Sequence, residues 1–204
     1  MKLILATAAV AALCAGAPAA FAQDTTSTTT TTGVYGNLGW SHVTTNGADT
    51  EGVQGRVGYR FMPFLGVEGE LRAGLSTGHT SVDYTAGTPP VTTSTDLGVK
   101  QKYGAAGYVV GFLPLMPNRF DLLARVGYGW SRYDLSPSSS SGLPSGSGDE
   151  HGIRYGVGAQ YLFDGANGVR VDYTRERMSN LDVPAGLDVN NHANVWGVSF
   201  VHKF

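Results

Sequence analysis

The segment RVGYRFMPFLGVEGEL, residues 56–71, decides the fold, because apolar and charged side chains alternate along it on both sides of Met62-Pro63. Before this joint the odd-numbered positions are mainly apolar, with Arg56 and Arg60 between them. After the joint the apolar positions alternate with Glu68 and Glu70. A period of two is typical of β-strands, whose successive side chains point to opposite faces. The segment therefore predicts two antiparallel strands joined by a tight turn.

The same alternation recurs along the rest of the chain and predicts eight strands in all. They are expected at residues 34–42, 52–61, 65–75, 97–112, 120–131, 153–163, 169–176 and 195–204. The second half of 97–112 is apolar on both faces, so the alternation leaves the register of that strand open.

The connectors between these strands are by turns short and long. The short ones are 62–63, 113–118 and 164–168, and the long ones are 43–51, 76–96, 136–150 and 179–191. A barrel that spans a membrane sorts its connectors in this way, because every second one lies on the same side. The pattern predicts an all-β fold, an eight-stranded antiparallel up-and-down transmembrane β-barrel. The alternative is a secreted soluble barrel with its aromatic face inside.

The front of the chain is predicted to be an export signal. Lys2 supplies a positive charge, residues 3–13 are apolar, and Ala20-Phe21-Ala22 has the small residues of a cleavage site. We expect residues 1–22 to be a signal peptide, 23–32 a disordered Thr-rich periplasmic lead-in, and 33–204 the barrel. A lipoprotein signal with a lipidated Cys14 is the rival interpretation, which the bulky Leu13 disfavours.

Composition excludes several classes of function. The formal net charge is −2 and no basic cluster or Gly-rich phosphate motif is present, which argues against nucleic acid as a partner. The single cysteine lies in the predicted signal, so the mature chain has no thiol chemistry. The five histidines lack the spacing of metal ligands. We expect no cofactor and no metal.

The two faces of the predicted strands differ in chemistry. One collects charged residues, which should point into the barrel as a network of paired charges: Arg56, Arg60, Glu68, Glu70, Arg72, Lys100, Lys102, Asp121, Arg125, Arg154, Asp172 and Glu176. The other carries aromatic residues near strand ends, as in interfacial girdles: Trp40, Tyr59, Phe61, Tyr128, Trp130, Tyr161, Phe163, Trp196 and Phe200. The interior of eight strands is just wide enough for side chains to fill, so a packed plug is expected, with a narrow conduit as the alternative.

Three segments resemble a known family. WGVSFVHKF, residues 196–204, is similar to the terminal strand of bacterial outer-membrane proteins, and Phe204 would be the aromatic end that the assembly machinery is thought to read. Residues 56–71 and 168–175 look like strands of the porin-family or OmpA-like transmembrane barrels. The resemblance covers about residues 33–204 and departs from full-length OmpA in having no peptidoglycan-binding domain after the eighth strand. It implies the barrel and no substrate.

We expect an integral protein of the outer membrane of a Gram-negative bacterium, with a structural or limited-permeability role in the cell envelope. Expected partners are outer-membrane lipid, lipopolysaccharide and the barrel-assembly machinery. A surface adhesin that binds a ligand through its extracellular loops is the alternative, since loops on a rigid scaffold carry binding.

An outer-membrane enzyme that modifies lipid is a minor alternative. It would need a Ser-His-acid set near the outer rim, for which His42 and His151 with Ser41, Ser131 or Asp149-Glu150 are nominal candidates. No tight motif links these residues, so we do not expect an enzyme.

Overall fold

The computed structural model describes residues 32–45, 48–86, 91–137, 146–177 and 192–204. Within these ranges no helix is long and apolar enough to cross a membrane. The predicted signal peptide and almost all of the predicted lead-in lie outside the described residues, as does the predicted loop 179–191.

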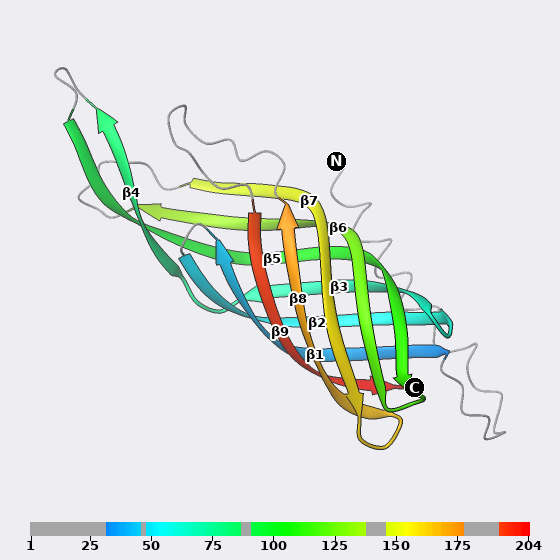
Figure 1. Cartoon of the computed structure of the whole chain (residues 1–204). Coiled ribbons are helices and arrows are strands. Elements are labelled where there is room, and N and C mark those ends of the chain that lie inside the picture. The colour runs from blue at the N-terminus through cyan, green and yellow to red at the C-terminus, as the bar shows by residue number, and fades with distance from the viewer. Residues whose placement is uncertain (1–31, 46–47, 87–90, 138–145, 178–191) are drawn as a thin grey trace. The chain divides into compact units, whose positions relative to one another are not determined.

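The described residues form nine strands, drawn in Figure 1. Their bounds are β1 (Gly33–Thr45), β2 (Ala48–Met62), β3 (Leu65–Gly74), β4 (Gly78–Ala86), β5 (Val91–Met116), β6 (Phe120–Pro137), β7 (Gly146–Leu162), β8 (Asn167–Arg177) and β9 (His192–Lys203).

These strands make a closed eight-stranded antiparallel barrel. Chain neighbours pair around the wall, β1 pairs with β9, and β3 pairs with β5 to complete the circle. β3 and β4 both pair with β5, at its residues 103–111 and 91–99. The two short strands are therefore successive pieces of one barrel strand, and the predicted all-β transmembrane-type barrel of eight strands is confirmed.

The interruption between β3 and β4 is held by the neighbouring strand. The backbone N–H groups of Leu75 and Ser76 both donate to the carbonyl oxygen of Glu51, at 2.7 and 3.2 Å. The Glu51 N–H in turn donates to the Ser76 hydroxyl oxygen, 2.7 Å away. The wall thus keeps its hydrogen bonds where the ladder is irregular.

Three tight connectors lie at one end of the barrel, which we call the turn end; both Gly33 and Phe204 lie there too. In one of them Asn118 has a φ of 57° and the Arg119 N–H donates to the Met116 carbonyl, as in a type II turn after Pro117. In another, the Asp164 carboxylate accepts from the side-chain amide of Asn167 and from the backbone N–H groups of Asn167 and Ala166, and these bonds lower the pKa of Asp164 to about 2.

The opposite end, which we call the loop end, differs from the sequence-based expectation. The predicted loop 43–51 is mostly strand, because β1 runs to Thr45 and β2 begins at Ala48. The predicted loop 76–96 is mostly the hairpin of β4 and β5, which projects at the upper left of Figure 1. β6 and β7 also continue beyond the last β7–β8 pair, Arg154 with Glu176. Paired strands therefore extend well past the rest of the rim.

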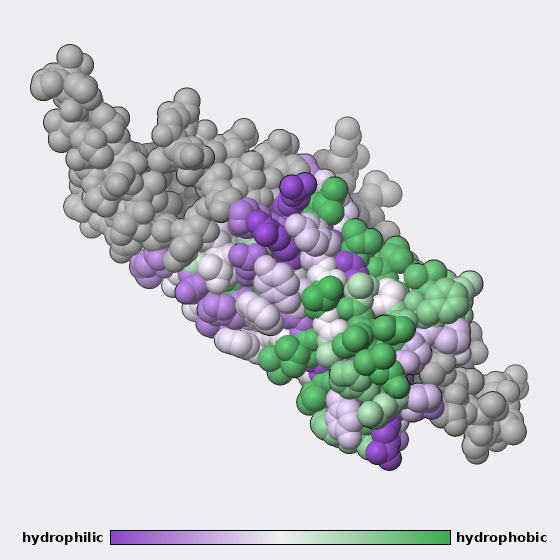
Figure 2. Space-filling model, in the orientation of Figure 1, coloured by the Kyte–Doolittle hydropathy of each residue, from purple (hydrophilic) through white to green (hydrophobic). Residues whose placement is uncertain are grey.

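The outer wall carries many exposed apolar side chains, which we call the apolar belt. It includes Leu38 (69 % exposed), Leu71 (59 %) and Val157 (59 %) among many others. Figure 2 shows these residues gathered toward the turn end, with hydrophilic side chains toward the loop end. Charged residues lie inside instead, where Arg56, Glu70 and Asp172 are at most 2 % exposed. This inverts the plan of a soluble barrel and contradicts the soluble alternative.

Candidate functional site

A network of buried ion pairs fills the middle of the barrel, and Arg56 lies at its centre. Its Nη1 and Nη2 atoms donate to the two carboxylate oxygens of Asp172, at 2.9 and 3.0 Å, and its Nε donates to Glu70 at 2.7 Å. Parallel bonds from one guanidinium to one carboxylate are among the strongest hydrogen bonds in proteins. Residues on β2, β3 and β8 are joined across the lumen in this way.

The network continues toward the loop end through two further arginines. Arg72 donates to Glu176 at 2.9 Å and to Glu70 at 2.8 Å. Arg154 lies 3.3 Å from Glu176 and donates to the Ser131 hydroxyl at 2.7 Å. Gly129 is what makes room for this arginine, because a Cβ atom there would lie 2.3 Å from the Arg154 Nε.

Two more arginines complete what we call the central network. Arg170 donates to both carboxylate oxygens of Glu68, and Arg125 donates to Asp172 and to the Thr174 hydroxyl. The members are Arg56, Arg72, Arg125, Arg154, Arg170, Glu68, Glu70, Asp172 and Glu176. All are at most 4 % exposed, so each charge depends on its partners.

An apolar layer closes the lumen on the turn-end side of the central network. Its side chains are Tyr35, Tyr108, Val110, Phe112, Leu123, Leu162 and Val201. The Tyr35 hydroxyl donates to Glu68 at 2.7 Å and the Tyr108 hydroxyl donates to Glu70 at 3.3 Å, so the two rings tie the layer to the network. This layer was not predicted, because only polar residues were expected inside.

Beyond the apolar layer, at the turn end, lies a separate ion pair. Arg60 donates to Asp121 at 3.1 Å, and its guanidinium stacks 4.3 Å from the centre of the Phe112 ring. The Arg60 Nε also donates to the Pro63 carbonyl of the tight turn. The described interior is therefore stacked as ion pairs, an apolar layer and a further ion pair.

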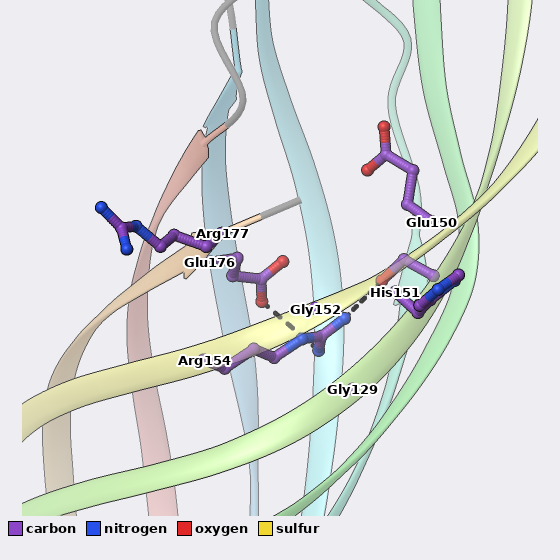
Figure 3. Close-up of a pocket in the computed structure, with 8 residues that line it drawn as sticks. Gly129, Glu150, His151, Gly152, Arg154, Glu176 and Arg177 are labelled. Carbon is purple, nitrogen blue, oxygen red and sulfur yellow. Dashed lines mark hydrogen bonds and ion pairs between the residues drawn. The ribbon is translucent and has the colours of Figure 1, made fainter. Parts of the chain in front are cut away.

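A small pocket, which we call the rim pocket, opens above the central network. It is lined by Gly129, Ser131, Glu150, His151, Gly152, Arg154, Glu176 and Arg177, and its volume of about 10 Å³ accommodates one water molecule. In Figure 3 Arg154 reaches Glu176, whereas Glu150 points away from it. Burial and the nearby negative charge of Glu176 raise the pKa of Glu150 to about 7. Glu150 lies beyond Ile153, where the apolar belt of β7 ends.

This raised pKa predicts a dependence of stability on pH. In the unfolded chain Glu150 ionises near pH 4.5, whereas in the folded barrel it stays protonated up to about pH 7. Its contribution to stability is therefore complete below pH 4.5 and is lost as the pH rises through 7. We expect a loss on the order of 1–2 kcal/mol, less than the full shift implies because the pocket admits water.

The measurement is urea unfolding in detergent micelles at pH 5 and pH 8, with Glu150→Gln as the matched variant. From pH 5 to pH 8 the free energy of unfolding should decrease less in the variant than in the wild-type protein. Equal decreases in the two proteins would show that Glu150 does not titrate in this window.

The structure places most of the predicted interior residues together. Ten of them are buried inside the barrel: Arg56, Arg60, Glu68, Glu70, Arg72, Asp121, Arg125, Arg154, Asp172 and Glu176. Lys100 and Lys102 are not inside. Both are exposed, and Lys102 pairs on the surface with Asp134 at 2.8 Å. Arg170, fully buried, was missed although it alternates in phase with Asp172.

The predicted girdle residues all lie on the outer wall. Toward the turn end are Tyr59, Phe61, Tyr161, Phe163 and Phe200, and toward the loop end are Trp40, Tyr128, Trp130 and Trp196. Tyr103 and Tyr173 join the loop-end group, since their rings lie 5.4 Å from Trp130 and 4.9 Å from Trp196. Phe204 is 82 % exposed at the turn end.

The nominal partners for catalysis are not brought together as the sequence suggested. Ser41 is buried on the inner face, whereas His42 lies on the outer face of the same strand. Ser131 is bound to Arg154, and the ring of His151 lies 6.2 Å from that of Tyr128. Among the described residues, no group of three or more His, Cys, Asp or Glu side chains is arranged to hold a metal ion.

Comparison with known proteins agrees with this architecture. A family model described as outer membrane protein beta-barrel domain matches residues 5–204. No curated protein sequence matches the chain.

Three solved structures have similar folds. The outer membrane protein OprG from Pseudomonas aeruginosa has a TM-score of 0.58 at 14 % identity, over 84 % of this chain and 96 % of that one. Ail of Yersinia pestis, in complex with the heparin analogue sucrose octasulfate, has a TM-score of 0.51 at 19 % identity, over 85 % of this chain and 99 % of that one. Neisserial surface protein A has a TM-score of 0.51 at 12 % identity, over 86 % of this chain and 98 % of that one. Identities this low establish a shared fold alone.

Proposed function

The chain belongs to the outer membrane protein β-barrel domain family, and we propose that it serves as a closed, structural barrel of the Gram-negative outer membrane. The observation that carries this proposal is the filled interior, in which the apolar layer lies across the lumen beside the central network. A barrel filled in this way anchors the protein and stiffens its wall but leaves no path for solutes.

The arrangement in the membrane follows from the apolar belt. We infer that the belt meets lipid acyl chains, that the girdle residues lie at the two interfaces, and that the turn end faces the periplasm. Residues 1–22 would then be a cleaved export signal and 23–32 a periplasmic lead-in. Outer-membrane lipid and lipopolysaccharide would contact the belt. The assembly machinery would read Phe204, whose N–H donates to the Val34 carbonyl at 3.0 Å.

Planar-bilayer recording tests the closed lumen. We expect the purified wild-type barrel to give no stable large conductance, because Phe112, Leu123 and their neighbours occlude the lumen. The double substitution Phe112→Ala and Leu123→Ala should raise the frequency of conducting events, since it removes two of the layer's larger side chains. Steady wild-type conductance of porin size would overturn the proposal.

Heat-modifiable migration on a gel, combined with membrane fractionation, tests the location. A folded barrel in the outer-membrane fraction should migrate differently when it is not boiled. A boiling-insensitive band in the periplasmic fraction would contradict insertion.

Surface binding is a second candidate function, favoured by the strands that extend past the loop-end rim. β4 to β7 form a paired sheet that would stand clear of the membrane. Attachment of intact cells to host or abiotic surfaces, compared with a strain whose hairpin 78–99 is deleted, distinguishes this role from a purely structural one. Equal attachment by the two strains would exclude it.

A further inference from the structure

A histidine on the outer wall of β1 has both ring nitrogens engaged at the loop-end rim. His42 lies two residues beyond Trp40 and is paired in register with Glu51 of β2 and with Trp196 of β9. Its Nδ1 lies 2.8 Å from the Glu51 Oε1. A carboxylate can only accept, so Nδ1 donates to Glu51, while Nε2 lies 3.6 Å from the Asp49 Oδ1 and close to the Thr44 hydroxyl. The Glu51 contact thereby fixes the orientation of the ring, and in the neutral form of the ring Nε2 is the nitrogen that can accept a proton.

A hydroxyl group lies at that second nitrogen. Thr44 follows His42 on the same face of β1, and its Oγ1 is 3.4 Å from the His42 Nε2. The same hydroxyl donates to Asp49 at 2.8 Å in the resting structure. If the Thr44 hydroxyl hydrogen turns from Asp49 to the Nε2 atom, a chain of hydrogen bonds runs from the Thr44 hydroxyl through the imidazole to the Glu51 carboxylate. Catalytic hydrogen bonds of this kind are often loose before substrate binds.

The position of these groups indicates what could reach them. His42 and Glu51 are 30 % and 38 % exposed. The ring of Trp40 lies 6.0 Å from that of His42, so the cluster borders the loop-end aromatic residues. Aromatic girdles mark the boundary between hydrocarbon and headgroups. The ester carbonyls of membrane lipids lie at this boundary, so the proposed membrane orientation would bring them near Thr44.

We propose that Thr44, His42 and Glu51 form a hydrolytic site for acyl esters of lipids in the outer leaflet. The site rests on the proposed membrane orientation and adds an activity to the structural role. Thr44 is the nucleophile, His42 is the general base, and Glu51 is a positioning residue that holds the imidazole.

The reaction balances without any added reagent except water. The Thr44 oxygen attacks the ester carbonyl carbon while His42 Nε2 takes the hydroxyl proton. The carbon–oxygen bond to the lipid alcohol then breaks, and His42 returns the proton to that alcohol. A water molecule, deprotonated by His42, next attacks the acyl-threonine. This step releases a fatty acid and restores the Thr44 hydroxyl.

The first experiment measures free fatty acid released by the full chain folded into vesicles. One arm contains diacyl phosphatidylethanolamine and the other lipopolysaccharide, so that release in either arm identifies the lipid source. Thr44→Ala and His42→Asn should each lower the rate about 100-fold or more. Thr44→Ser should keep most of it, because it retains the hydroxyl. Thr45→Ala, a threonine on the inner face of the same strand, should leave the rate unchanged.

Two further measurements separate catalysis from a structural role. An alkyl fluorophosphonate should label the peptide that contains Thr44, with loss of fluoride, and should not label Thr44→Ala. Glu51→Gln should lower kcat with little change in KM, because it acts through the imidazole.

No fatty acid above protein-free vesicles in either arm, or a Thr44→Ala rate equal to wild type, would overturn the site. Each variant is also tested for heat-modifiable migration. A barrel that folds and inserts but releases no fatty acid contradicts the hydrolytic site alone. A barrel that does not insert contradicts the structural proposal.

Discussion

Asp172→Asn is expected to lower the free energy of unfolding by about 3–5 kcal/mol, because it leaves buried arginines without their counter-charge. Asp172 accepts two hydrogen bonds from Arg56 and one from Arg125 and lies 3.9 Å from Arg170. An asparagine fills the same volume but carries no charge. Its amide also turns two donors toward the guanidinium groups. Urea unfolding of the barrel in phospholipid vesicles measures the difference.

The matched control is an ion pair on the surface of the same barrel. Asp134→Asn breaks the pair with Lys102, in which the Lys102 and Asp134 side chains are 49 % and 30 % exposed. Exposed pairs contribute about 0–1 kcal/mol, so this substitution should change stability little. A loss at Asp172 no larger than the loss at Asp134 would mean that water reaches the central network and screens it.

The sequence predicts the strands and their faces because alternation responds directly to which face meets lipid. Arg56, Glu70 and Asp172 were assigned to the interior on that ground alone. Their pairing was beyond prediction, since Arg56 and Asp172 are 116 residues apart and meet only because the barrel closes. Arg170 could have been assigned to the interior as well, because it lies two residues before Asp172 on the same strand and therefore points to the same face.

Alternation fails where a strand changes phase. Gln101 pairs with Tyr133 and Tyr103 pairs with Arg132, so Lys102 is an extra residue in β5. A β-bulge of this kind reverses which positions point inward. Gln101 is therefore buried, while Lys100 and Lys102 face outward. In the apolar second half of β5 the sequence could not show that Val110 and Phe112 point inward. Side chains that face lipid and side chains in the apolar layer are of the same types.

The sequence did not predict the loop-end hairpins, because strands that extend beyond the apolar belt do not need one apolar face and so show no alternation. Thr44, Thr45 and Asp49 continue the β1–β2 ladder with polar side chains on both sides. Such residues are typical of loops when only composition is considered. The contacts of His42 depend on this ladder, so the sequence placed His42 at the rim but could not assign Thr44 and Glu51 as its partners.

Val57→Arg should destabilise the barrel by about 2–4 kcal/mol if the apolar belt faces lipid, since Val57 lies midway along β2 and its side chain points outward. Leu115→Arg is the matched substitution near the turn end, where the belt ends. An arginine there can extend its guanidinium into the interface, so the expected cost is about 0–1 kcal/mol. Unfolding in vesicles measures both.

The difference between these two positions is the decisive quantity, because they differ in depth along the barrel but not in exposure. Both side chains are about half exposed, at 53 % and 52 %, so a barrel in water would treat them alike. In water, exposed substitutions usually stay within about 0.5 kcal/mol of wild type. A cost that falls from Val57 to Leu115 therefore requires a hydrocarbon layer around the middle of the barrel. Equal and small costs would refute the outward orientation of the belt toward lipid, and with it the location of Thr44 beside lipid esters.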